Sequence, residues 1–134
     1  PELPLAEELR RLGLYLDLQR MRFVDRLTVR VEVDHALAAA RVPAMLLQPL
    51  VENALSHGIG ARPGAGTLVV RAERVAAAAS GAPALRLVVR DDGVGLGGPA
   101  PAREGTGLRN TRERLATLYP GAHRFVVRPA ASLD

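Results

Sequence analysis

The chain contains no cysteine and no lysine, and it has few aromatic residues. Without cysteine it can form neither a disulfide nor a thiolate metal site, which suits a reducing compartment. Aromatic residues make up 3% of its 134 residues, so the core must consist mainly of leucine, valine and alanine. Because all 18 basic residues are arginine, a bound phosphate must be met by arginine, backbone amides or a metal ion.

The composition also argues against two common classes of partner. No apolar run approaches the roughly 20 residues that span a bilayer, so we expect no membrane insertion by this segment. The formal net charge of +4 comes from arginines that alternate with acids and lack interleaved aromatic residues. That pattern is typical of a solvated surface, and we expect no nucleic acid as a partner.

The spacing of apolar residues predicts helices and strands within one domain, 1–134. Pro49 lies inside a predicted helix, where its missing N–H predicts a kink. Hairpin-like connections predict an α+β two-layer sandwich, with helices packed on one face of a mixed, mostly antiparallel sheet. The predicted helices cover 5–23, 43–58 and 107–118, and the predicted strands lie near 27–33, 68–72, 85–89 and 125–127.

The first predicted helix, 5–23, has one apolar face that is expected to pack on the core or to belong to a dimer interface. Glu7 and Glu8 are expected on its exposed surface. The apolar face consists of Leu5, Leu9, Leu12, Leu16 and Phe23.

The second predicted helix has two distinct sides. At 100° per residue, Leu47, Val51 and Leu55 share a side that must meet the sheet. Asn53 and His57 are poor helix formers on the other side, and a carboxamide oxygen suits Mg²⁺. This side is either a ligand site or a partly exposed polar face without a ligand. Its members are Gln48, Pro49, Glu52, Asn53, Ser56 and His57.

A carboxylate ends the apolar row of the strand near 85–89. Asp91 points to the same side as Leu87 and Val89 because side chains alternate along a strand. A buried carboxylate is costly without donors, so Asp91 should have one, and the exocyclic amine of adenine is suitable. The alternative is a capping or turn role, since Asp-Gly is also a turn signal.

The segment Gly105-Thr106-Gly107 opens the third predicted helix. Its glycines let a ligand approach the backbone, and the free amides of the first turn form an anion site. Arg109 would oppose the helix dipole unless an anion were bound. The alternative is an ordinary helix start with surface arginines.

Three segments in this order resemble the boxes of the Bergerat ATP-binding fold: QPLVENALSHG its N box, DDGVGL and GTGLRNTRERLATLYPG its two glycine boxes. Histidine kinases, gyrase and MutL share that fold. The chain is most similar to sensor histidine kinases of the LytS/YehU type, within the GHKL group. EELRRLGLYLDLQRMRFVDRL resembles the helix that leads into their catalytic domain, which implies that 1–24 is this leading helix.

The resemblance implies a site for ATP and Mg²⁺. Asn53 would coordinate the metal, Glu52 would support it, and His57 would lie against the nucleotide. Asp91 would accept a hydrogen bond from the adenine amine, and Arg103, in the ATP lid, would contact phosphate. The glycine segments would shape the pocket and offer backbone to the phosphates through Gly93, Gly95, Gly105, Thr106, Gly107 and Leu108.

The chain departs from the family pattern in three ways. Ser56 stands where the family usually has lysine, which removes one phosphate contact. The phosphoacceptor hairpin is missing, because His35, His57 and His123 lack a Pro-His-Phe context. The last strand usual in the family is also missing. We therefore expect an excised catalytic domain, trimmed at both ends and inactive without its acceptor helix.

The implied function is two-component signalling. The domain would donate the γ-phosphoryl group of Mg-ATP to a histidine on the dimerisation and phosphoacceptor domain, and a response regulator would then receive it. Hydrolytic relatives place a glutamate one turn before the metal-binding asparagine, where this chain has Pro49. The alternatives are a non-catalytic nucleotide-binding or interaction module and an anti-sigma-factor-type serine kinase. We expect a cytoplasmic location, in a parent protein anchored in the bacterial inner membrane.

Overall fold

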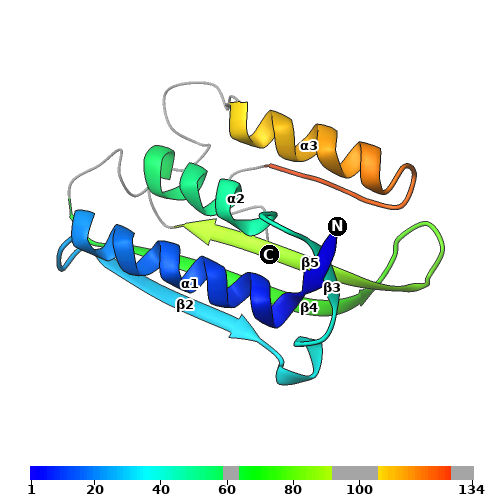
Figure 1. Cartoon of the computed structure of the whole chain (residues 1–134), viewed down its shortest axis with the longest axis horizontal. Coiled ribbons are helices and arrows are strands. Elements are labelled where there is room, and N and C mark those ends of the chain that lie inside the picture. Colours follow the sequence, from blue (N-terminus) through cyan, green and yellow to red (C-terminus); the bar gives the residue numbers. More distant parts are fainter. Residues whose placement is uncertain (59–63, 92–105, 128–134) are drawn as a thin grey trace.

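The computed structural model describes residues 1–58, 64–91 and 106–127, with only the backbone of 57, 58 and 106. No helix within these ranges is both long and apolar enough to cross a membrane. In chain order the elements are β1 (Glu2–Pro4), α1 (Leu5–Arg22), β2 (Leu27–Val33), the 3-10 helix η1 (His35–Leu37), β3 (Arg41–Pro43), α2 (Leu47–Asn53), the π-helical turn η2 (Ala54–Gly58), β4 (Gly66–Ala76), β5 (Pro83–Asp91) and α3 (Thr106–Leu118) (Figure 1).

The main sheet has the strand order β2–β4–β5. β2 runs parallel to β4, and β4 is joined to β5 by a hairpin and runs antiparallel to it. β1 and β3 form a separate antiparallel pair. The predicted α+β class and the mixed, mostly antiparallel sheet are therefore confirmed.

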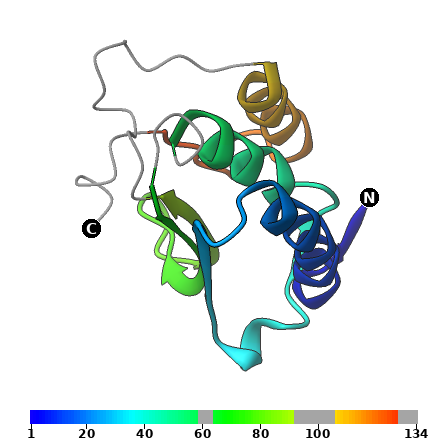
Figure 2. The ribbon, with the colours of Figure 1, turned by 90° about the vertical axis from the view of Figure 1, so that its left-hand side faces the viewer.

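One face of the main sheet is covered by α1 and α2 (Figure 2). α2 lies between α1 and α3 and contacts both. Leu108 and Thr111 are the buried residues of α3. The largest core cluster joins α1, α2, η2 and β4 through Leu12, Leu16, Phe23, Leu47, Val51, Ala54, Leu55, Leu68 and Val70.

α1 confirms the first predicted helix, with one correction. Leu5, Leu12 and Leu16 are buried at helical spacing, and Phe23 follows as the C-cap. Glu8 was expected on the surface, and that prediction is wrong because its side chain is 3% exposed. It lies three residues after Leu5 and four before Leu12, and therefore belongs to the buried face.

α2 begins later than the sequence predicted. Pro43 belongs to β3, and Met45 has a φ of 61°, so the chain turns before the helix starts at Leu47. Pro49 therefore lies in the first turn, where a backbone N–H has no acceptor within the helix. The reason for a kink disappears, because proline costs no helical hydrogen bond at that position.

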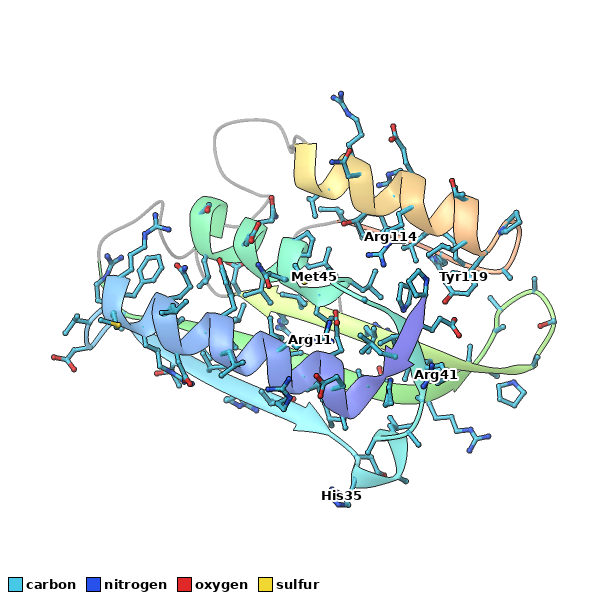
Figure 3. The ribbon with its side chains drawn as sticks, viewed as in Figure 1. Arg11, His35, Arg41, Met45, Arg114 and Tyr119 are labelled. Atoms are coloured by element: carbon cyan, nitrogen blue, oxygen red, sulfur yellow. The ribbon has the colours of Figure 1, made fainter. Side chains whose placement is uncertain are left out.

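The strand predicted near 125–127 is wrong. This segment has no strand pairing and contacts α3 instead. The Arg112 guanidinium lies 4.8 Å from the centre of the Phe125 ring, and its Nη1 donates to the Phe125 carbonyl at 3.2 Å. At the end of α3 the Tyr119 hydroxyl hydrogen-bonds to the Glu2 carboxylate in β1 (Figure 3).

Candidate nucleotide-binding site

The C-terminal end of α2 and the end of β5 lie toward the same end of the molecule, and α3 starts above α2 (Figure 1). α2 contacts both β5 and α3, and η2 contacts β5 as well. The three segments singled out from the sequence belong to these three ends. The fold therefore brings together what the chain separates by more than fifty residues.

Asn53 and Glu52 lie on the side of α2 that faces away from the core. The apolar side is buried as predicted, with Leu47, Val51 and Leu55 at most 1% exposed. Asn53 is half-buried and ends the helix. Glu52 is exposed and accepts a hydrogen bond from Gln48 Nε2 at 3.1 Å.

The π-helical turn η2 starts directly after Asn53. Its wider i to i+5 hydrogen bonding changes the angle between successive side chains, and such turns are frequent at functional sites. Ser56 is exposed in this turn. The backbone of His57 belongs to it, but the direction of the His57 side chain lies outside what the structure describes.

Asp91 is the last residue of β5 and pairs with Leu68 of β4. Val89 pairs with Val70 on the rung before, and both Leu68 and Val70 are buried. The half-buried Asp91 side chain therefore lies on the helix-covered face of the sheet, as the alternation predicted. A carboxylate accepts hydrogen bonds only, so a ligand group beside it must be a donor.

The start of α3 lies beside α2. A Cβ built on Gly107 would lie 3.9 Å from the Cβ of Pro49. Pro49 is one turn before Asn53 and on the same side of α2, so Gly107 lies next to the face that carries Asn53. Because 3.9 Å is an ordinary contact and Gly107 is helical, the fold does not require glycine here.

The first turn of α3 has a positive potential. It contains no acidic residue and includes the exposed Arg109. The first amides of a helix have no acceptor within that helix, and they add to this potential together with the helix dipole. Leu108 is buried beside these amides and fixes the helix against its neighbours.

Several predicted site residues cannot be placed. Gly93, Gly95, Arg103 and Gly105 lie outside the described ranges, as does the side chain of Thr106. In the parts of the chain that are described, no three histidine, aspartate or glutamate side chains gather as a metal site. A Mg²⁺ ion that takes most of its oxygens from phosphate and water needs few protein ligands.

A separate hollow of about 280 Å³ lies at the other end of the sheet, and its lining includes Leu37, Arg74 and Leu85. Leu85 lies near the start of β5, six residues before Asp91. This hollow is therefore not part of the candidate site.

Two side chains of α1 that interact with α2 were missed from the sequence. Glu8 accepts hydrogen bonds from backbone amides at the start of α2. Burial raises the pKa of Tyr15, and the nearby Glu52 carboxylate raises it further. The spacing of Glu8 within the buried face of α1 was an available signal, whereas nothing in the sequence pairs Tyr15 with Glu52.

No protein-family model matches the chain. It is 31% identical to the sensor protein LytS of Enterococcus faecalis, over 93% of this chain and 22% of that protein. It is 32% identical to the sensor histidine kinase BtsS of Escherichia coli, over 86% of this chain and 19% of that protein. LytS of Bacillus subtilis is 30% identical over 87% of this chain and 21% of that protein.

The chain therefore spans about a fifth of the length of the curated relatives it matches. The match covers most of this chain in each of the three. Its homologues are sensor histidine kinases of the LytS/YehU family, and the chain matches one segment of such a kinase.

Proposed function

We propose that this chain is the ATP-binding catalytic domain of a sensor histidine kinase. It would bind Mg-ATP and donate the γ-phosphoryl group to a histidine on a separate dimerisation helix. One observation carries the proposal: α2 contacts both β5, which ends in the Asp91 carboxylate, and α3, whose Gly107 lies beside Pro49. The sensor-kinase homologues support the same class of protein.

The adenine would lie beside Asp91. This carboxylate is half-buried at the edge of the core, where a donor lowers the cost of its partial burial. Adenine presents an exocyclic amine, which donates, whereas guanine presents a carbonyl oxygen at the same place. Asp91 would therefore favour adenine over guanine.

The phosphates would lie between α2 and α3. The amides at Gly107 and Leu108 and the positive first turn of α3 suit an anion, and Asn53 lies on the neighbouring side of α2. Mg²⁺ would neutralise the phosphates, with Asn53 as its protein oxygen ligand and Glu52 supporting the metal site. The roles of His57, Gly93, Gly95, Arg103, Gly105 and Thr106 remain predictions from the resemblance.

In the reaction a nitrogen of the acceptor imidazole would bond to the γ-phosphorus while the bond from phosphorus to the bridging β,γ-oxygen breaks, releasing ADP. The protein supplies mainly positioning and charge neutralisation in such a transfer. Pro49, one turn before Asn53, offers no base to activate water. Glu52 is rotated about 100° from Asn53 around α2 and binds Gln48, which favours transfer over hydrolysis.

The partners that follow from this proposal are the phosphoacceptor domain of the parent kinase and a response regulator. The domain would act on the cytoplasmic side of a membrane-anchored parent. One observation favours the alternative of a non-catalytic module: Ser56 is exposed where the family usually has lysine, which leaves one cation fewer for phosphate.

Calorimetric titration with Mg-ADP, Mg-GDP and a non-hydrolysable ATP analogue tests the proposal. We expect one site per chain, a preference for adenine, and tighter binding with Mg²⁺ than with EDTA. Asn53→Ala should remove the Mg²⁺ dependence, and Asp91→Asn should reduce the preference for adenine. Thr117→Ala and Asp17→Asn are controls, because both side chains are exposed on other faces. Unchanged Mg-ADP affinity in Asn53→Ala would contradict the metal assignment.

The titration also separates the alternatives. No binding of any nucleotide would favour the interaction module. If Mg-ATP binds, an acceptor helix supplied in trans should become phosphorylated, and the product should be labile to acid as phosphohistidine is. An acid-stable product would favour the serine kinase.

A further inference from the structure

Glu8 is a buried carboxylate that joins α1 to the start of α2. Its Oε1 accepts from the backbone N–H of Met45 at 3.0 Å. Its Oε2 accepts from the N–H groups of Leu46 and Leu47 at 2.7 and 2.9 Å. These amides have no acceptor within α2, so a single carboxylate satisfies three donors at once.

The start of α2 is therefore fixed by another element rather than locally. The N-cap residue Leu46 provides no side-chain hydrogen bond. Met45 has a φ of 61°, in the left-handed region, and lies where the chain enters α2 (Figure 3). Glu8 is 37 to 39 residues away in sequence from the three amides that it binds.

Tyr15 of α1 lies near the other end of α2. Burial raises the pKa of this half-buried side chain, and the charge of the Glu52 carboxylate raises it further. The hydrogen bonds from the backbone at the start of α2, however, go to Glu8.

We propose that Glu8 is a positioning residue for the nucleotide site. By fixing the first turn of α2, it sets the place of Asn53 at the other end of the same helix, relative to β5 and α3. α2 has seven residues and is about 10 Å long, so a shift of its first turn reaches Asn53. This inference rests on the proposed function, because Asn53 is the Mg²⁺ ligand there.

The proposed site requires that Glu8 hold α2, and with it Asn53, accurately in place. Metal and phosphate ligands work within about 0.5 Å of their productive positions, and a misplacement of about 1 Å costs up to about a hundredfold in rate. The apolar side of α2 keeps the helix on the core through Leu47 and Val51. Without Glu8, α2 should stay packed on the core but shift in position along the sheet.

Two adjacent acids provide a matched experiment. Glu8→Gln keeps the shape of the buried side chain but removes its charge and introduces donors that face the three amides. Glu7→Gln makes the same change on the partly exposed neighbour, which binds Arg10 and Arg11 instead. For each variant, the dissociation constant of ADP is measured in EDTA and in Mg²⁺, well below the unfolding temperature. The constant in EDTA divided by the constant in Mg²⁺ gives the factor by which Mg²⁺ strengthens ADP binding.

We expect Glu8→Gln to reduce this ratio about tenfold, because Asn53 moves out of place. The affinity for ADP in EDTA should change little, since Asp91 lies on β5 and not on α2. Glu7→Gln should change neither value. A Glu8→Gln protein that unfolds more easily but keeps the wild-type ratio would overturn the proposal and leave Glu8 a purely structural role.

A second measurement separates this inference from the proposed function. If the wild-type protein binds no nucleotide, the proposed function fails, and amide hydrogen exchange then tests Glu8 by itself. Glu8→Gln should speed exchange along α2 as far as Asn53, compared with Glu7→Gln. Faster exchange confined to Met45, Leu46 and Leu47 would overturn the inference.

Glu8→Asp replaces Glu8→Gln if the latter does not fold. It keeps the charge but is one methylene shorter, so it cannot reach all three amides. We expect a smaller reduction of the same ratio, and an unchanged ratio would overturn the proposal.

Discussion

The N-termini of α2 and α3 both have a positive dipole end and amides without an acceptor inside the helix, but their surroundings differ. At α2, the buried Glu8 carboxylate accepts from three amides. At α3, the first turn carries no acid and includes Arg109. The positive end of α2 is therefore compensated by Glu8, whereas the first turn of α3 contains no acid of its own, which suits an external anion.

This difference gives the two helix N-termini different roles, one in folding and one in the binding of an anion. A terminus neutralised from within contributes to folding and cannot also hold a ligand. A terminus that keeps its positive potential beside Asn53 gives up stability unless an anion binds. The comparison therefore predicts that changes at the N-terminus of α2 lower the free energy of unfolding and reach the site only through the position of Asn53, whereas changes at the N-terminus of α3 alter the affinity for phosphate directly.

The largest expected effect is on Glu8. Glu8→Ala leaves three amides without their acceptor in a largely buried place, so we expect a loss of about 3 kcal/mol in the free energy of unfolding. Glu7→Ala, a change at the partly exposed neighbour, should cost far less. Chemical denaturation at pH 7 measures both. Equal losses in the two variants would contradict the claim that Glu8 compensates the positive end of α2.

A second expectation concerns Gly107 in α3, with Gly13 in α1 as its control. A Cβ fits at both positions, and alanine forms helix better than glycine by up to about 1 kcal/mol. Both Gly107→Ala and Gly13→Ala should therefore raise the unfolding midpoint. Only Gly107→Ala should weaken Mg-ADP binding, because its methyl group would lie where phosphate approaches the backbone. Unchanged affinity in Gly107→Ala would contradict the close approach.

The smallest expected effect is the pH dependence of the stability that Glu7 contributes. Hydrogen bonds from Arg10, then Arg11, lower the pKa of Glu7 from 4.5 to about 2. A depressed pKa in the folded state stabilises the protein above pH 4.5, and that contribution is lost as the pH falls through 2. The small difference in unfolding midpoint between wild type and Glu7→Gln should therefore shrink between pH 4.5 and 2. The Glu7 side chain and its arginine partners reach solvent, so added salt should weaken the effect too. A difference that persists at pH 2 would contradict this origin.

Much of the fold could be predicted because the pattern of the chain is local. α1, β2, β5 and α3 follow from periods of 3.6 and 2, and the buried side of α2 follows from the same rule. Asp91 on the core-facing row follows from alternation along β5. The three polar segments could therefore be found without coordinates.

The remaining features depend on contacts between distant residues. The start of α2 at Leu47 reflects the pairing of β3 with β1 and the left-handed Met45, neither of which leaves a periodic signal. The helical spacing places Glu8 on the buried face of α1, but nothing in the sequence identifies the three amides that it binds. The segment near Phe125 has strand-like residues, but its contacts with Arg112 hold it against α3. The π-helical turn after Asn53 also changes the direction of later side chains.

The central claim is that Asn53, Asp91 and Gly107 line one site. The most direct test is to follow backbone amide NMR signals while Mg-ADP is added to the wild-type protein. We predict that the largest shifts occur together at these three residues, at a common dissociation constant. Shifts centred on the hollow around Leu37 and Leu85, or separate constants for the three residues, would contradict the claim.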